Sequence, residues 1–244
     1  MGKLREFFQL YPDVELISPE ATELGVCPEA SEQLVQFNIE WHVIPSADAV
    51  PLNDAYMARF YPLAAPDFTI PHEHKPSYRE AITAGHRKHQ GRIIGVETTV
   101  KPRYLPSNRQ FYGTPYGFKA SADPFCMYLA QAGMTNATRY AHNYLSLRTF
   151  VNVVNDDWRE RGVLPSGYRL TVCPPAIFNF VGNIFHPEWS ATQTLELGFY
   201  RDDQNNATCF AVGCNAPNDF SYISEIEFET DWTLAGFRTA LVPE

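Results

Sequence analysis

Four histidines lie close together in the sequence and have the side chain that most often binds transition metals. His72 and His74 are two residues apart in an extended stretch, so their side chains point the same way. His86 and His89 are three residues apart in an expected helix, which places them on one face. Because imidazole binds zinc and other divalent transition metals, these four residues predict a metal site. A His-rich polar surface without metal has the same pattern, and both interpretations stay open.

The cysteines indicate free thiols rather than a second metal site. The chain has five cysteines, an odd number, which favours reduced thiols in a non-secreted protein. We therefore expect a cytoplasmic location, or a virion if the protein is viral. Cys209 and Cys214 are expected on one strand but on opposite sides of it, so buried structural thiols explain them better than a shared ion.

Several motifs that would fix a reaction are absent from the sequence. There is no G-x-S-x-G nucleophile elbow, no G-x-x-x-x-G-K-[ST] phosphate loop and no G-x-G-x-x-G dinucleotide turn. Serine hydrolysis, nucleotide hydrolysis and nicotinamide-dependent redox chemistry are therefore disfavoured. No catalytic residue and no cofactor-binding residue is assigned from the sequence.

The charge is unevenly distributed along an acidic chain. The 244 residues carry 19 basic and 28 acidic side chains, a formal net charge of −9. Residues 72–110 are the exception, with 8 basic against 3 acidic side chains, and we call this segment the basic belt. One such belt is a poor ligand for nucleic acid, because phosphate contacts need a concentrated positive surface. We expect no direct specific nucleic-acid binding, and we expect the belt to pair with the acidic ends of this chain or of a neighbouring copy.

The apolar pattern predicts a single α+β domain over residues 1–244. Apolar spacing of three and four, with Pro and Gly at the ends, predicts helices over residues 3–11, 53–61, 77–90, 123–132 and 144–161. Alternating apolar and polar residues predict a strand with one wet face over 33–44. Short polar turns predict an antiparallel meander in the C-terminal third, with helices packed on or beside the sheet; its strands are expected over residues 168–173, 193–200, 208–213, 220–230 and 234–242. No apolar run approaches the roughly 20 residues that span a bilayer, so no membrane partner is expected.

Residues 102–121 are expected to form a long loop or arm that is rich in aromatic side chains. Three Pro and two Gly in this segment disfavour regular structure. Aromatic patches of this size seldom stay in contact with water. We therefore expect the arm to pack on a neighbouring subunit of a homo-oligomer, through Tyr104, Phe111, Tyr112, Tyr116 and Phe118.

One segment resembles a known family. The stretch WRERGVLPSGYRLTVCPPAIFNFV, residues 158–181, is expected to form the end of a helix, a Pro-containing turn, a strand ending in Pro and an apolar segment. It resembles a stretch of the major capsid proteins of tailed phages with the HK97-type fold, and the matching residues are Pro165, Gly167, Arg169, Val172 and Pro174. The resemblance implies a structural, assembling protein.

These observations favour a non-enzymatic, self-associating structural subunit of a viral or phage particle. The first alternative is a metal-dependent enzyme that uses His72, His74, His86 and His89 to hold Zn²⁺ or another divalent transition metal. The second alternative is a module that binds a small ligand in an aromatic-lined pocket. In the leading interpretation the protein has no cofactor.

Overall fold

The computed structural model describes residues 3–51, 53–60, 85–99, 104–105, 109–110, 123–134, 139–140, 142–192, 195–201, 207–213, 222–227, 229, 231 and 235–244. Within these ranges the chain is an α+β structure with an antiparallel sheet in its C-terminal part, as the sequence predicts. None of the described helices is long and apolar enough to cross a bilayer.

The first sheet brings the last strand of the chain into its centre. Its order is β1-β2-β10-β5, and every neighbouring pair is antiparallel. The strands are β1 (Ile39–Val43), β2 (Ile93–Glu97), β10 (Thr239–Pro243) and β5 (Tyr168–Val172). Because β10 pairs with both β2 and β5, the C-terminal residues are required to complete this sheet.

The second sheet contains three strands of the expected meander, whereas the strand expected over 168–173 is β5 of the first sheet. Its order is β8-β7-β6-β9, in which the antiparallel strands are β6 (Leu195–Arg201), β7 (Ala207–Gly213) and β8 (Tyr222–Ile226). β9 (Ala235–Phe237) adds to β6 in the parallel direction. The strand expected over 234–242 is thus two strands that meet at Arg238 and join different sheets. β3 (Tyr104–Leu105) and β4 (Arg109–Gln110) pair with each other and form a separate two-stranded sheet.

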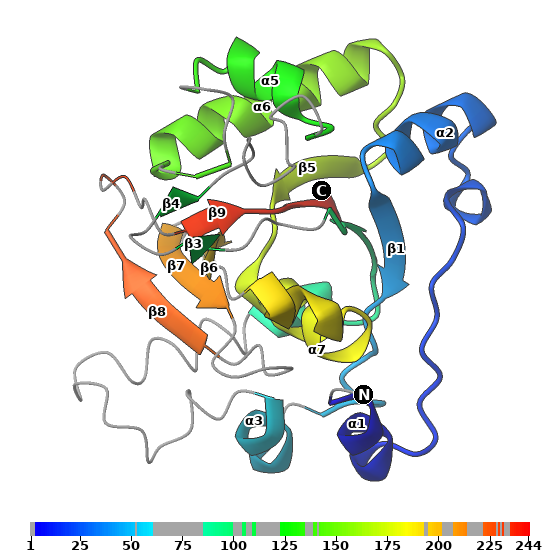
Figure 1. Ribbon diagram of the computed structural model, residues 1–244. Helices are drawn as coiled ribbons and strands as arrows, with labels where there is room; N and C mark the ends of the chain where they lie inside the picture. Colours follow the sequence, from blue (N-terminus) through cyan, green and yellow to red (C-terminus); the bar gives the residue numbers. More distant parts are fainter. Residues whose placement is uncertain are drawn as a thin grey trace.

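Helices lie on both sides of the two sheets (Figure 1). On one side are α2 (Pro28–Gln36), α5 (Cys126–Gln131) and α6 (Tyr144–Glu160), whose apolar residues share a core with Trp41 and Leu241 of the first sheet. On the other side are α1 (Leu4–Leu10), α3 (Asp54–Phe60) and α7 (Pro175–Ile184), which share a second core with Ile94 and Val242. Short 3₁₀ helices at Ala21–Leu24 (η1) and Pro187–Thr192 (η5) complete the described set.

α7 is the central element of the second core. All ten of its residues are buried, and all are apolar except Asn179 and Asn183, whose amide groups donate to the backbone carbonyls of Phe60 and Asn179. It approaches the second sheet closely because Gly198 of β6 has no side chain, and a Cβ there would lie 3.0 Å from Pro175. The helix therefore has a fixed position, and so does the chain that leaves its C-terminal end.

The strand expected over 33–44 is shorter than the alternation suggested. Residues up to Gln36 belong to α2, which begins with Pro28 at its first turn, and only Ile39–Val43 form β1. Asn38 separates the two elements with a φ of 55°, a conformation that Asn tolerates better than most residues. The polar face of β1 is also not uniformly wet, because Glu40 is exposed whereas His42 is buried.

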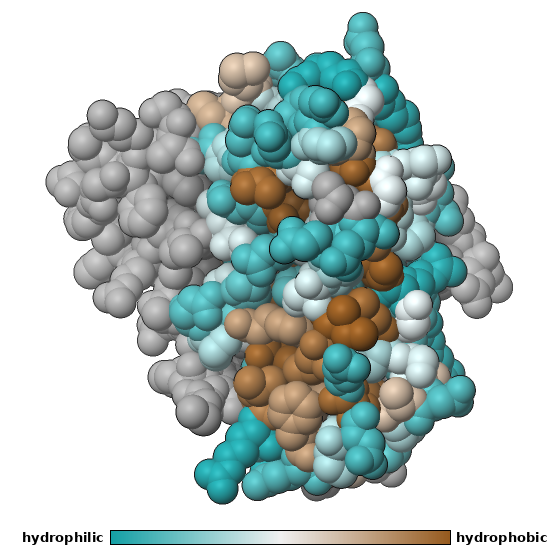
Figure 2. Space-filling model, turned by 90° about the vertical axis from the view of Figure 1, so that its right-hand side faces the viewer, coloured by the Kyte–Doolittle hydropathy of each residue, from teal (hydrophilic) through white to brown (hydrophobic). Residues whose placement is uncertain are grey.

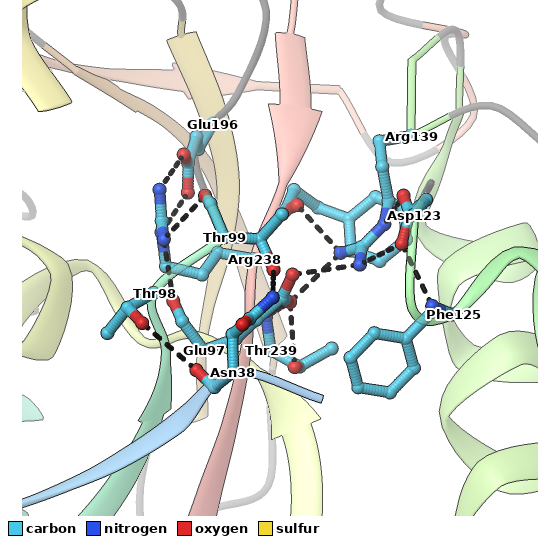
Figure 3. A network of polar contacts seen from close by, with 11 residues as sticks. Asn38, Glu97, Thr98, Thr99, Asp123, Phe125, Arg139, Glu196, Arg238 and Thr239 are labelled. Carbon is cyan, nitrogen blue, oxygen red and sulfur yellow. Dashed lines mark hydrogen bonds and ion pairs between the residues drawn. The ribbon is translucent and has the colours of Figure 1, made fainter. Parts of the chain in front are cut away.

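Buried arginines connect the first sheet with its surroundings (Figure 3). Arg139 donates to both oxygens of Glu97 on β2, at 2.8 and 3.0 Å, and to Asp123 at 2.6 and 2.8 Å. Arg238, between β9 and β10, donates to Glu196 on β6 at 2.9 and 3.0 Å and packs 3.6 Å over the ring of Trp189. Each of these buried charges has an oppositely charged partner. The cluster therefore holds the surrounding elements together and is not a reactive site.

Candidate metal centre

β1 places Glu40 and His42 side by side. The two residues are separated by one position in a strand, so their side chains lie on the same face, while Ile39 and Trp41 enter the core behind them. Pairing with β2 fixes the strand, with Glu40 opposite Val96 and His42 opposite Ile94. The face that carries Glu40 and His42 is the one toward α7, since Phe185 at the end of that helix packs on the His42 ring at 4.4 Å.

The C-terminal end of α7 brings His186 to the same place. The backbone N–H of His186 donates to the carbonyl of Val181 at 3.0 Å, which closes the C-terminal end of the helix. Its ring stacks on Trp189, with 4.8 Å between centroids and 7° between planes. Packing on Trp189 therefore fixes the plane of the imidazole before any ligand binds.

The three side chains converge on one point. The Nε2 atom of His186 lies 3.0 Å from Oε2 of Glu40, and the Nε2 atom of His42 lies 3.8 Å from the same oxygen. One ligand atom from each residue lies within 4.8 Å of the other two. The side chains are 50% exposed for Glu40, 14% for His186 and 1% for His42. The group thus opens to solvent on the side of Glu40 and is closed on the side of His42.

The outward-facing nitrogen of each ring has its own oxygen partner. Nδ1 of His186 lies 2.7 Å from Oε1 of Glu188, and Nδ1 of His42 lies 3.3 Å from Oγ of Ser18. In the tautomer where Nδ1–H donates to these oxygens, both Nε2 atoms present a lone pair toward Glu40. This arrangement is the one that orients histidine ligands in metal sites.

His42 is buried with an unused nitrogen. Among the described residues its Nε2 has no hydrogen-bond partner, although the atom is shielded from water. Burial, with a smaller contribution from His186, lowers the pKa of His42 from 6.5 to about 3. The ring is therefore neutral at physiological pH, which is the form that binds a metal. A buried polar nitrogen without a partner costs free energy, and an ion at this point would satisfy it.

The spacing of the three ligand atoms suits a tetrahedral ion. Bonds of about 2.0–2.1 Å to nitrogen and oxygen at tetrahedral angles separate two ligand atoms by about 3.3 Å. The distances of 3.0 and 3.8 Å lie on either side of this value. Because the Glu40 side chain is half exposed, a small rotation of its carboxylate equalises them. The group can hold zinc or another ion that accepts two imidazoles and one carboxylate.

The histidines predicted from the sequence have a different environment. His72 and His74 lie outside the described residues, so a site formed by all four histidines stays a prediction. His86 and His89 are both buried rather than on a polar surface. His86 packs on Tyr56 and Phe180, and burial, with a smaller contribution from His89, lowers its pKa to about 3.

Among the arm residues that the sequence predicts at an interface, the described ranges include only Tyr104, which lies in β3. The other four lie outside those ranges: Phe111, Tyr112, Tyr116 and Phe118. Of the two cysteines considered together, Cys209 is buried on β7, where burial raises the pKa of its thiol to about 12, and Cys214 lies outside the described residues.

Comparisons with known proteins identify no relative from which a function can be transferred. Searches against protein-family models, against curated proteins and against solved structures each found no match. The assignment of a function to this chain therefore depends on the geometry of its own residues.

Proposed function

We propose that the protein binds a divalent transition metal, zinc foremost, through Glu40, His42 and His186. The observation that carries the proposal is the convergence of two Nε2 atoms and one carboxylate oxygen, with each Nδ1 atom anchored by a separate oxygen. This site is separate from the metal site expected in the basic belt, which stays a prediction.

The number of ligands suits a reactive centre better than a structural one. Structural zinc sites are closed by four protein ligands, whereas catalytic sites use three and keep one position for water. Here Glu188 is engaged with the far nitrogen of His186, which leaves three ligands among the described residues and an open side at Glu40. Zinc held in this way lowers the pKa of its bound water to about 7, which is the chemistry of metal-dependent hydrolysis.

Metal stoichiometry tests the proposal. Protein stripped with a chelator and dialysed against micromolar Zn²⁺ is expected to retain one ion per chain, measured by plasma mass spectrometry. His186→Ala and Glu40→Gln are each expected to weaken binding by at least about tenfold, because each removes one of three ligands. Glu15→Gln, which also neutralises an exposed glutamate, is the matched control and should bind as the original protein does. Absence of stoichiometric zinc, or equal binding by His186→Ala, would contradict the proposal.

A second candidate function is self-association as a structural subunit. It is supported by exposed apolar side chains near the N-terminus, namely Phe8, Leu10 and Ile17. Figure 2 shows apolar residues gathered over the lower half of one face of the molecule. Contiguous apolar surface of this kind is typical of an interface. The resemblance of residues 158–181 to phage capsid proteins supports the same candidate.

Light scattering after size-exclusion chromatography tests self-association. The protein at tens of micromolar is expected to have at least twice the mass of a monomer. Phe8→Ser combined with Leu10→Ser should shift it toward monomer, whereas Val35→Ser combined with Met127→Ser, at exposed apolar positions on other helices, should not. A monomeric protein at low and high salt would exclude this candidate.

A further inference from the structure

A cavity of about 290 Å³ lies beside α6, at the edge of the first sheet formed by β5. One face of α6 lines it with residues that recur at three- and four-residue spacing from Tyr144 to Arg159. The opposite wall includes Arg169 and Thr171 of β5, and Pro174 and Pro175 at the start of α7. The cavity is therefore at the opposite end of α7 from His186, and the residues of the metal centre do not line it.

The floor of the cavity is apolar and buried. It includes Leu147 of α6, Val172 of β5, Phe210 of β7 and Ile223 of β8, all of which belong to the two cores. Its volume is at the small end of the range for ligand sites, about 300–1,000 Å³. The floor thus accepts the apolar body of a small molecule.

The rim of the cavity is positively charged. Among the described lining residues, four are cations, Lys88, Arg148, Arg159 and Arg169, and one is acidic, Asp156. Arg159 pairs with Glu244 at 2.6 Å. In the described part of the chain, the side chains of the other three cations form no hydrogen bond or ion pair. Three cations that face a single carboxylate give the rim a net positive charge, which attracts an anion to the apolar floor.

A buried histidine forms part of the wall of the cavity. His89 lines the cavity and is 6% exposed, and its Nδ1 atom has no hydrogen-bond partner among the described residues. Burial is the main reason that its pKa falls to about 4, and the nearby charges of Lys88, Arg92 and Arg169 lower it further. The ring is therefore neutral at pH 7 and adds no charge to the wall of the cavity.

We propose that this cavity binds a small organic anion, with its apolar body on the floor and its acidic headgroup between Arg148 and Arg169. Guanidinium groups bind carboxylate and phosphate groups through paired hydrogen bonds, so either headgroup suits the rim. The site is independent of the metal centre in both position and chemistry.

Calorimetric titration with octanoate, octylamine and inorganic phosphate tests the proposal. Octanoate combines the apolar body and the anion, octylamine reverses the charge and phosphate lacks the body. Octanoate is expected to bind one-to-one and at least about tenfold more tightly than either of the others, because only octanoate uses both the floor and the rim. Equal binding of octylamine, or no binding of octanoate at millimolar concentration, would overturn the proposal.

Two double variants with equal net charge distinguish the effect of the rim residues on binding from the effect of the protein's overall charge. Arg148→Glu combined with Arg169→Glu is expected to weaken octanoate binding by at least about tenfold, because both charges next to the headgroup are reversed. Arg5→Glu combined with Arg87→Glu changes the net charge by the same amount at exposed positions outside the cavity and should bind normally. Equal binding by the two double variants would overturn the assignment of the rim.

Discussion

The imidazole of His186 meets the carboxylate of Glu40 with Nε2 3.0 Å from Oε2, although 146 residues separate them in the chain. The contact exists because α7 is buried along its whole length and ends beside β1. A position fixed by the core is what a preorganised metal ligand needs, and it distinguishes this pair from two charged groups that meet on a mobile surface.

Glu188 is expected to tune the metal centre without binding the ion. Replacing it by Gln removes the negative charge that faces Nδ1 of His186 at 2.7 Å and weakens the contact that orients the ring. We expect Glu188→Gln to weaken zinc affinity by about 10–100-fold with the stoichiometry unchanged, as measured by competition with a chelator. The control is Glu29→Gln on the exposed surface of α2. Loss of all bound zinc would instead identify Glu188 as a ligand.

Arg139 is expected to contribute strongly to stability. Arg139→Met leaves the carboxylates of Glu97 and Asp123 buried without their cation, which typically costs about 3–5 kcal/mol. The matched variant Arg159→Met breaks an exposed pair with Glu244 and should change the free energy of unfolding by about 1 kcal/mol or less. Urea denaturation followed by circular dichroism measures both. Similar losses of unfolding free energy in the two variants would show that the buried cluster does not stabilise the fold more than an exposed ion pair does.

His86 is expected to destabilise the fold as it stands. Neither of its ring nitrogens has a hydrogen-bond partner in the described part of the chain, and its neighbours Tyr56 and Phe180 are aromatic. His86→Phe removes the unsatisfied nitrogens while keeping a ring, and should raise the free energy of unfolding by about 1–3 kcal/mol at pH 7. A variant that is less stable and has lost bound zinc would instead support the site expected at His72, His74, His86 and His89.

Buried histidines also predict loss of stability in acid. The pKa values of His42 and His86 are lowered to about 3 and that of His89 to about 4, in each case mainly by burial. Between pH 6.5 and these values, the unfolded chain takes up protons at the three rings while the folded chain does not. The contribution of the three neutral rings to the free energy of unfolding is therefore complete above pH 6.5. It falls as the pH drops, with a slope of up to about 1.4 kcal/mol per pH unit for each ring.

Urea denaturation of the metal-free protein between pH 7.5 and 5 measures this dependence. His86→Phe has one such ring fewer. The slope of its free energy of unfolding against pH should therefore be smaller by up to about 1.4 kcal/mol per pH unit. Stability that is constant over this range would show that the rings are protonated as easily in the folded chain as in the unfolded one.

Local periodicity was sufficient to predict most of the elements. The helix expected over 144–161 is α6, and the alternation at 39–43 gives β1, because in both cases one face packs on a core. The expected strand over 234–242 divides because Arg238 is anchored to Glu196 on β6, a contact between residues 42 positions apart. No local pattern contains that information.

The same limit applies to the candidate site. Glu40-x-His42 was visible as the polar face of a strand, and His186 and Glu188 lie two residues apart. Neither pair is distinctive alone, and four histidines in the basic belt formed a denser pattern. Only the packing of α7 against the first sheet joins the two pairs, and this depends on contacts across the whole chain.

X-ray absorption at the zinc edge, on protein loaded with one equivalent of Zn²⁺, tests the metal centre most directly. The account predicts nitrogen and oxygen neighbours at about 2.0–2.1 Å and the outer-shell scattering of two imidazole rings. In His186→Ala, loaded to the same level, the scattering of one ring should remain. Zinc surrounded only by oxygen atoms, or a spectrum that is identical in the variant, would contradict a site formed by Glu40, His42 and His186.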